Sequence, residues 1–297
     1  MFASADSNID RRTALKGLAG GAAAAAFTTH SSAQDTGLYK AKNGRIKQSV
    51  VPWCFKGMSV GDLAKNGASL GLQSVELCSP SEWPKLKALG LTCAIASSHG
   101  FARGFAHVEE HAECIDTLRK SIDAASEFGC PSVITFSGFA RGMTKEDGFK
   151  NMVEGLKKIV GYAEQKRVTL CLEMLNSRVN QDMKGHPDYL ADDIDYSVEI
   201  CKSISSEWMK VLFDIYHVQI MNGDVINRIK QHLPYIGHVH TAGNPGRGEI
   251  DDTQEINYAP IMRALADAGY TGFVGQEFIP VRDPIPSLAQ AVQICDV

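Results

Sequence analysis

The stretch that decides the fold is KVLFDIYHVQ, residues 210–219. Residues 211–213 form a short apolar run of the β type, and Asp214 follows where the chain is expected to leave the core. His217 comes three residues later, past the end of the predicted strand. A buried strand that ends in an acidic residue marks either an ordinary turn or part of a site. The same arrangement recurs along the chain, and this recurrence predicts the fold.

Short strand-like segments alternate with stretches in which apolar residues recur every three to four positions. The predicted strands are 48–55, 74–77, 91–97, 132–136, 169–175, 209–214, 236–242 and 272–278. Their regular alternation with helical segments predicts parallel βαβ units. Because there are eight such units and no Gly-rich GxGxxG motif follows the first strand, we expect a single-domain (β/α)8 TIM barrel rather than an open doubly wound sheet.

The predicted helices carry recognisable end signals. Thr144 is a plausible N-cap, because acidic residues occupy the first turn of the helix that follows it. Gly71, Gly90, Gly129 and Gly269 each lie where a helix should pass into a strand, as a left-handed C-cap requires.

The N-terminal residues do not resemble a folded domain. Residues 10–33, DRRTALKGLAGGAAAAAFTTHSSA, pair two arginines with a weakly apolar Ala/Gly-rich stretch that ends in small residues. This pattern predicts a twin-arginine signal peptide over 1–33, with the barrel over 34–297. A membrane anchor is disfavoured because the 13-residue stretch 15–27 is too short to span a bilayer, and a surface helix is disfavoured because glycines weaken it. We expect export through the Tat machinery and a periplasmic or secreted location.

Composition excludes several classes of protein. The formal charge of −4, without a run of Lys and Arg, argues against a nucleic-acid partner. Beyond the N-terminus no apolar run is long enough for a stable membrane anchor. None of the eight cysteines forms a CxxC pair, so a zinc ribbon is unsupported. Disulfide pairing and a homo-oligomeric state stay open.

The carboxyl ends of barrel strands share one face, where catalytic residues are found. Polar residues at or near those ends are His99, Glu173, Asp214, His240 and Glu277. Each acid alone could pair with an arginine or cap a helix, since a buried unpaired carboxylate costs several kcal/mol. Three acids and one histidine from four consecutive strands instead converge on one side of the barrel. This oxygen-rich set suits one divalent cation such as Mn²⁺, Mg²⁺ or Co²⁺.

Four longer stretches carry a family resemblance: CLEMLN, FDIYHVQIMNGD, GHVHTAGNPGRGEIDDTQEINY and GFVGQEFIP. They resemble the hydroxypyruvate isomerase group of the xylose-isomerase-like TIM barrels, whose close relatives are the ketose 3-epimerases. The resemblance is strongest over 168–280 and weaker, though in register, over 46–167.

The resemblance implies a divalent metal held by Glu173, Asp214, His240 and Glu277. It also implies that Glu173 and Glu277 form the proton-transferring pair. In one place the sequence departs from the group. Hydroxypyruvate isomerases have a pattern similar to H-[LV]-Q at the strand-7 ligand, whereas this chain has His at position 240, as in the sugar epimerases and xylose isomerase. The metal site fits either residue, and the substrate stays open.

The expected activity is a metal-dependent isomerisation of a small aldose/ketose-type hydroxy-carbonyl compound through a metal-stabilised enediolate. The nearest reaction is the conversion of hydroxypyruvate to tartronate semialdehyde. The alternatives are a ketose 3-epimerase and a metal-dependent lyase or hydrolase acting on a sugar derivative. The endonuclease IV group shares the Asp-x-x-His spacing, but its site needs more His and Asp ligands for several metal ions. A non-catalytic sugar-binding protein is a further alternative, but it would not need all four predicted metal ligands.

Further residues are predicted to contact the substrate. His217 can donate to a substrate oxygen; the alternatives are a residue that supports the metal ligands without touching substrate, and a helix cap. Arg247, on a Gly/Pro-bounded loop, can bind a carboxylate or hydroxyls, and Glu249 can orient it or bind substrate. His99 is either a substrate contact or a satisfied strand-end residue, and Glu76 is a secondary candidate. Residues expected in the pocket lining or the core are Trp53 and Phe55. Histidines expected on the surface or in loops are His107, His111, His186 and His232.

Overall fold

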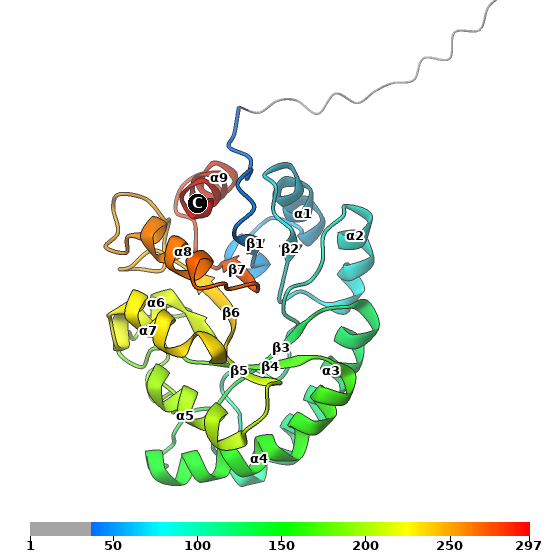
Figure 1. The fold of residues 1–297 in the computed structure, drawn as a ribbon, viewed down its shortest axis with the longest axis vertical. Helices are drawn as coiled ribbons and strands as arrows, with labels where there is room; N and C mark the ends of the chain where they lie inside the picture. The colour runs from blue at the N-terminus through cyan, green and yellow to red at the C-terminus, as the bar shows by residue number, and fades with distance from the viewer. Residues whose placement is uncertain (1–36) are drawn as a thin grey trace, which may run out of the picture. The chain divides into compact units, whose positions relative to one another are not determined.

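The computed structural model describes residues 37–297, so the predicted export signal at 1–33 lies outside the described residues. Within 37–297, seven parallel strands form one sheet in the order β2-β1-β7-β6-β5-β4-β3 (Figure 1). The strands are β1 (Lys47–Val50), β2 (Ser74–Val75), β3 (Ser132–Thr135), β4 (Thr169–Glu173), β5 (Met209–Asp214), β6 (Ile236–Thr241) and β7 (Phe273–Gln276).

The segment predicted as the third strand, 91–97, is not a regular strand but still closes the barrel between β2 and β3. Thr92 bridges Ser74, and Ala96 bridges Val133. Between these two contacts, the backbone N–H of Ala94 donates to the Ser74 hydroxyl at 2.8 Å. Because a side chain takes the place of a backbone carbonyl there, the ladder is interrupted. The predicted third strand is therefore replaced by two single bridges.

Helices follow the strands in chain order and surround them (Figure 1). They are α1 (Val60–Ser69), α2 (Trp83–Ala88), α3 (His111–Phe128), α4 (Lys145–Lys166), α5 (Ile194–Ile204), α6 (Ile215–Met221), α7 (Val225–His232), α8 (Tyr258–Asp267) and α9 (Pro284–Cys295). Short 3-10 helices occur at Pro52–Cys54, Pro80–Glu82, Val108–Glu110 and Leu233–Tyr235. Each strand, and the bridging segment, thus has its own helix, and β5 is followed by two, α6 and α7.

The predicted helix ends are confirmed. The Thr144 hydroxyl accepts from the backbone N–H of Asp147 at the start of α4. Gly71, Gly90, Gly129 and Gly269 all have φ between 75° and 88°. That left-handed conformation favours glycine, because a Cβ would clash with the backbone.

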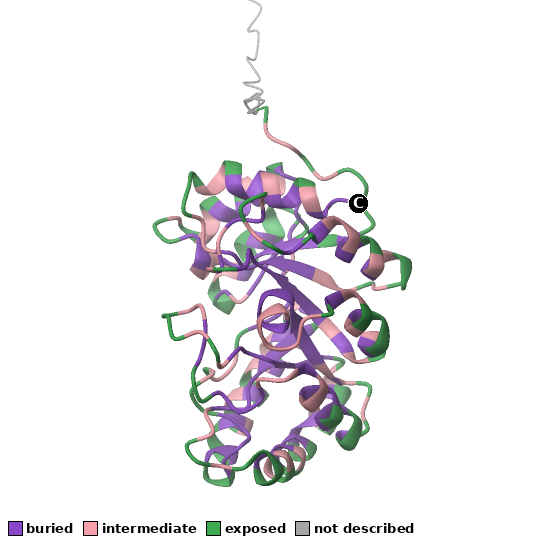
Figure 2. Ribbon diagram, turned by 90° about the vertical axis from the view of Figure 1, so that its left-hand side faces the viewer, coloured by how far each residue is buried: buried purple, intermediate pink, exposed green. Residues whose placement is uncertain are grey.

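The strands form the buried interior, and exposed residues lie on the surrounding helices and loops (Figure 2). In β5, residues 211–214 are all buried. Asp214 ends this strand and begins α6 directly, because its carboxylate accepts from the backbone N–H of Tyr216 at 2.8 Å. The acid is therefore fixed at the carboxyl end of the strand, on the face where barrel sites are built.

The structure also bears on membrane-spanning helices and on the cysteines. Among residues 37–297, no helix combines the length and the apolar character needed to cross a membrane. All eight cysteines are buried and unpaired.

Candidate active site

The ends of four neighbouring strands bring together the four predicted metal ligands. Glu173 and Asp214 are the last residues of β4 and β5, His240 is next to last in β6, and Glu277 directly follows β7. One ligand atom from each side chain lies within 4.8 Å of the others, and all four residues are buried. The parallel register pairs Asp214 with His240. Strand register therefore assembles the cluster from residues far apart in the sequence.

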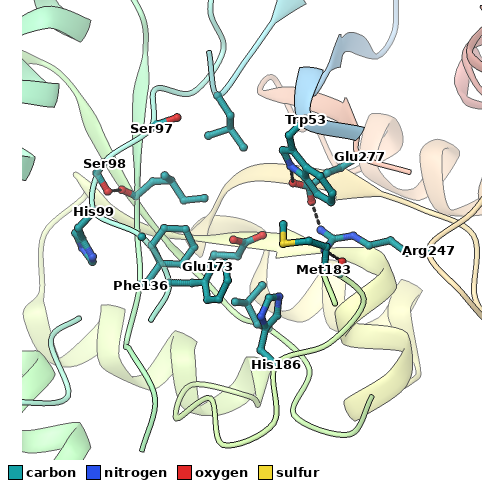
Figure 3. Close-up of a pocket in the computed structure, with 15 residues that line it drawn as sticks. Trp53, Ser97, Ser98, His99, Phe136, Glu173, Met183, His186, Arg247 and Glu277 are labelled. Carbon is teal, nitrogen blue, oxygen red and sulfur yellow. Dashed lines mark hydrogen bonds and ion pairs between the residues drawn. The ribbon is translucent and has the colours of Figure 1, made fainter. Parts of the chain in front are cut away.

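Three carboxylates in one buried cluster repel each other, and Arg247 offsets part of this charge. Its guanidinium forms an ion pair with Glu277 (Figure 3). The same guanidinium lies 3.4 Å from the Asp214 carboxylate. It also lies over the ring of Trp53, at 5.1 Å from the centroid. The Trp53 indole N–H donates to Glu277 at 3.0 Å. Because Arg247 is only 2% exposed, it is not a solvated loop charge.

The two glutamates have opposite electrostatic surroundings. Burial raises the pKa of Glu173, and the neighbouring Glu277 adds to this shift. Burial acts in the same direction on Glu277, but Arg247 and His240 outweigh it and hold the pKa of Glu277 well below its usual value. Burial also raises the pKa of Asp214 to about 7. Glu277 is therefore held ionised, whereas Glu173 more readily keeps a proton.

The cluster fits a divalent cation on its own geometry. Glu173 Oε1 and His240 Nδ1 are buried and have no hydrogen-bond partner in the part of the chain that the structure describes. His240 Nδ1 lies 3.0 Å from a Glu277 oxygen and 3.7 Å from Glu173 Oε1. A buried polar atom without a partner costs about 1–3 kcal/mol, which a coordinated cation would offset. Three carboxylates and one imidazole suit a hard or borderline divalent ion.

His217 is fully buried beside this cluster. The backbone N–H and the side-chain amide of Asn176 both approach its Nδ1, at 3.1 and 2.7 Å. Since those two donors need an acceptor, the ring proton belongs on Nε2, which lies 3.6 Å from Asp214 and has no hydrogen-bond partner among residues 37–297. Burial lowers the pKa of His217 well below its usual value, so the ring is neutral. His217 thus directs a donor toward the cluster, although it does not line the pocket.

A pocket of about 220 Å³ lies beside Glu173, Glu277 and Arg247 (Figure 3). Its lining is mainly apolar: Trp53, Leu77, Phe101, Ile134, Phe136, Leu175 and Met183. The polar residues are Ser97, Ser98, His99 and His186. The apolar lining and the acidic cluster therefore face the same cavity.

His99 lines the pocket as predicted, but both of its ring nitrogens already have partners. Nδ1 lies 3.2 Å from the backbone oxygen of Arg103, and Nε2 lies 2.9 Å from the Thr135 hydroxyl. Burial lowers its pKa. The ring is fixed at the pocket edge by these two contacts, as expected of a satisfied strand-end histidine.

His186 lies in a loop, in agreement with the expected surface or loop position, but its ring is buried and lines the pocket, which the sequence did not indicate. It is 6% exposed, lines the pocket and packs on Phe101 with ring centroids 4.3 Å apart. Burial, followed by the positive charge of Arg247, lowers the pKa of His186 to about 4. It lies in the long connection between β4 and α5, at the carboxyl face of the barrel, and the length of that connection was the available signal.

Three other histidines, expected on the surface or in loops, are also buried, each with a hydrogen-bond partner. His107 contacts the Phe139 carbonyl, His111 the Phe105 carbonyl and His232 the Asp195 carboxylate. Sequence reasoning missed them because a histidine in a polar segment gives no sign of which way its ring points.

Glu249 is not brought to the pocket. Its carboxylate accepts from the backbone N–H groups of Val281 and Arg282 at 2.8 and 2.9 Å, and from the Ser287 hydroxyl at 3.1 Å. These contacts join its loop to the segment between β7 and the start of α9. Phe55 packs in the core against Phe278, with ring centroids 5.6 Å apart.

A second buried cluster lies next to the first and shares His240 with it. Glu76, placed just after β2, accepts from Nε2 of His238 at 2.9 Å and from Nε2 of His240 at 2.8 Å. Burial would raise the pKa of Glu76, but the two histidines lower it to about 2. Glu76 is a secondary candidate from the sequence, and no local pattern indicates that it meets His240.

The chain is similar in sequence to proteins of a known family. A model of the xylose isomerase-like TIM barrel family matches residues 83–295. A human protein provisionally named hydroxypyruvate isomerase is 30% identical over 58% of this chain, which spans only 62% of that protein's length. A 2-oxo-tetronate isomerase of Cupriavidus necator is 30% identical over 72% of this chain and 84% of its own.

Among solved structures, a 3-keto-D-glucoside 4-epimerase from E. coli matches with a TM-score of 0.70. The match covers 84% of this chain and all of the epimerase, at 18% sequence identity. Similarity at that level of identity supports the barrel fold alone.

Proposed function

Since the chain belongs to the xylose isomerase-like TIM barrel family, we propose that it is a metal-dependent isomerase of a small hydroxy-carbonyl compound. The nearest reaction is that of hydroxypyruvate isomerase, from hydroxypyruvate to tartronate semialdehyde. The observation that carries the proposal is the pair Glu173 and Glu277, which come from different strands and line one pocket beside a cluster suited to a divalent cation.

The proposed reaction removes a proton from the carbon next to a carbonyl and returns one to the former carbonyl carbon. Glu277, held ionised by Arg247 and His240, can accept the proton, and Glu173 can hold or return one. A divalent cation, held by Glu173, Asp214, His240 and Glu277, supplies stabilisation for the negative charge that develops on the substrate oxygens. The Nε2–H of His217 is directed toward the same region.

One observation favours a second candidate, a ketose 3-epimerase. Arg247 is the one Lys or Arg side chain that lines the pocket within residues 37–297, and it is paired with Glu277 and Asp214. The pKa values of His99 and His186 are lowered, so these rings add no positive charge at neutral pH. An uncharged keto sugar requires no further cation, whereas a substrate carboxylate would compete for Arg247.

The test is solvent exchange. The purified protein, loaded with Mn²⁺, is incubated in D₂O with hydroxypyruvate, with 2-oxo-tetronate and with C4 to C6 ketoses, and products are followed by NMR and chiral chromatography. Deuterium at the carbon next to the carbonyl is expected for at least one substrate, and inversion at C3 would identify the epimerase. Absence of exchange with every compound contradicts both candidates.

Metal stoichiometry separates the remaining alternatives. About one ion per chain fits the proposed isomerase, whereas three would point to the nuclease-like chemistry of related barrels. Release of a smaller fragment from a sugar derivative, without exchange, would indicate a lyase or hydrolase.

We also propose that the protein is exported through the twin-arginine pathway, on the basis of the sequence pattern at 1–33. Replacing Arg11 and Arg12 by lysine should retain a fused reporter in the cytoplasm. Unchanged export would contradict a Tat signal.

A further inference from the structure

The ring of His240 has two different environments. Its Nδ1 faces the acidic cluster, 3.0 Å from Glu277 and 3.7 Å from Glu173, without a hydrogen-bond partner among the described residues. Its Nε2 faces the other way, 2.8 Å from Glu76 Oε1. An imidazole that binds a metal is neutral and carries one proton, so the partner of Nε2 decides which nitrogen is free to bind the metal.

Glu76 is placed to make that choice. An ionised carboxylate only accepts hydrogen bonds, so both histidines that contact Oε1 must present an Nε2–H. His238 makes the second of these contacts at 2.9 Å and helps to hold the carboxylate in position. With its proton on Nε2, His240 presents the lone pair of Nδ1 to the cluster.

We propose that Glu76 is a positioning residue, which fixes the tautomer and orientation of His240 so that Nδ1 can bind the cation. The inference rests on the divalent cation of the proposed function. Partners of this kind on metal-binding histidines typically change metal affinity by about 10–100-fold.

The contact crosses a neighbouring strand, and glycine makes this possible. Gly275 of β7 is paired with His240 of β6 on one side and with Ser49 of β1 on the other. A Cβ at position 275 would lie 2.2 Å from Glu76 Oε1 and 2.9 Å from His240 Cδ2. Any side chain at 275 would therefore displace one of the two partners. The path from Glu76 to His240 exists only because that position has no side chain.

Glu76, His238 and His240 also have ligand atoms within 4.8 Å of one another, which admits a second cation as the alternative. A metal-free, hydrogen-bonded cluster is favoured because the Nε2 atoms of both histidines lie at hydrogen-bond distance from the same Glu76 oxygen. That arrangement satisfies both donors without an ion.

The experiment is a double-mutant cycle on metal affinity. Mn²⁺ binding to metal-free protein is measured by calorimetry for wild type, Glu76→Gln, His240→Gln and the double variant. We expect Glu76→Gln to weaken binding about 10–100-fold in the wild-type background. A glutamine at 240 has no tautomer to fix, so Glu76→Gln should change affinity less than about threefold in that background.

An equal effect of Glu76→Gln in both backgrounds would overturn the inference, because Glu76 would then act by charge or fold alone. Two ions in wild type and one in Glu76→Gln would also overturn it, in favour of a second cation. The matched control is Glu110→Gln, a buried carboxylate that accepts from the Gly104 N–H and pairs with Arg141, outside both clusters. Its Mn²⁺ affinity should equal that of wild type.

A second measurement needs no variant. In wild type loaded with diamagnetic Mg²⁺, ¹⁵N NMR should find the His240 proton on Nε2, and a proton on Nδ1 would overturn the inference even if Glu76→Gln does not fold. Failure of the proposed function is distinguishable, because wild type would then bind no ion at all. If wild type binds one ion and Glu76→Gln binds it equally well, only the inference about Glu76 fails.

Discussion

The two halves of the barrel differ in regularity and in what they contribute to the pocket. In one half β4, β5, β6 and β7 have five, six, six and four residues, and their ends carry the acidic cluster. In the other half β1, β2 and β3 have four, two and four residues, and segment 91–97 makes only two bridges. That half, with the loops, supplies much of the apolar lining.

The difference separates two requirements on a site. Metal ligands need positions fixed to a fraction of an ångström, which continuous strand register provides. A substrate pocket needs side chains that together match the shape of the substrate. Short strands and long connections can provide them, because loop side chains are not bound to the alternation between the two faces of a strand. We therefore expect changes in the regular half to affect turnover and metal binding, and changes in the irregular half to affect substrate affinity.

The largest effect should come from the regular half. Glu277→Gln removes the ionised carboxylate of the proposed proton-transferring pair, and kcat should fall by about 10²–10⁴-fold. Steady-state assays on the substrate identified by deuterium exchange measure this. Glu110→Gln is the control, and its kcat should match wild type. A kcat of Glu277→Gln within tenfold of wild type would contradict the assignment.

Metal removal tests the same half without a mutation. Chelation should abolish turnover, and Mn²⁺ or Mg²⁺ should restore it. The metal-free chain should still unfold cooperatively, because the strand interior is apolar, but at a lower Tm than the loaded protein. Binding at 100 times Kd would add about 2.7 kcal/mol to the free energy of unfolding. In Asp214→Asn this metal-dependent rise in Tm should be much smaller, and an unchanged rise would contradict its role as a ligand.

Phe101→Ala tests the irregular half. Phe101 lines the pocket and contacts His186 and Phe136 by ring packing. Loss of an aromatic contact worth about 0.5–1.5 kcal/mol should raise KM by about 3–10-fold, with little change in kcat. A fall in kcat at unchanged KM would show that this half also positions the reacting atoms, and the comparison would fail.

The smallest effect concerns pH. The folded-state pKa of His186 is about 4, below the ordinary value of 6.5, so the unfolded chain binds its proton first as pH falls. The free energy of unfolding contributed by the neutral ring is present above pH 6.5 and is lost between about pH 6.5 and 4. His186→Asn should therefore show a smaller drop in Tm than wild type between these values. An identical drop in both proteins would contradict burial of a neutral ring.

Much of the fold and of the metal cluster could be predicted from the sequence. The repeating strand–helix alternation indicates a barrel, and apolar runs that end in an acid place Glu173 and Asp214 at strand ends. Helix caps at Thr144 and Gly129 follow from local backbone and hydrogen-bond preferences, so they too are readable. These features can be predicted because they depend on residues close in the sequence or on the periodicity of the strands.

Other features were decided only by the tertiary structure. His186 turns into the pocket, Glu249 holds the loop after β7, and Glu76 meets His240 across 164 residues of sequence. The bridging segment 91–97 has the composition of a strand but loses its ladder to one serine hydroxyl. The direction of a loop side chain and a contact across a barrel depend on packing among distant residues, such as the missing side chain at Gly275, and no local pattern records them. The sequence by itself determined which residues end the strands, and the folded chain decided what those residues meet.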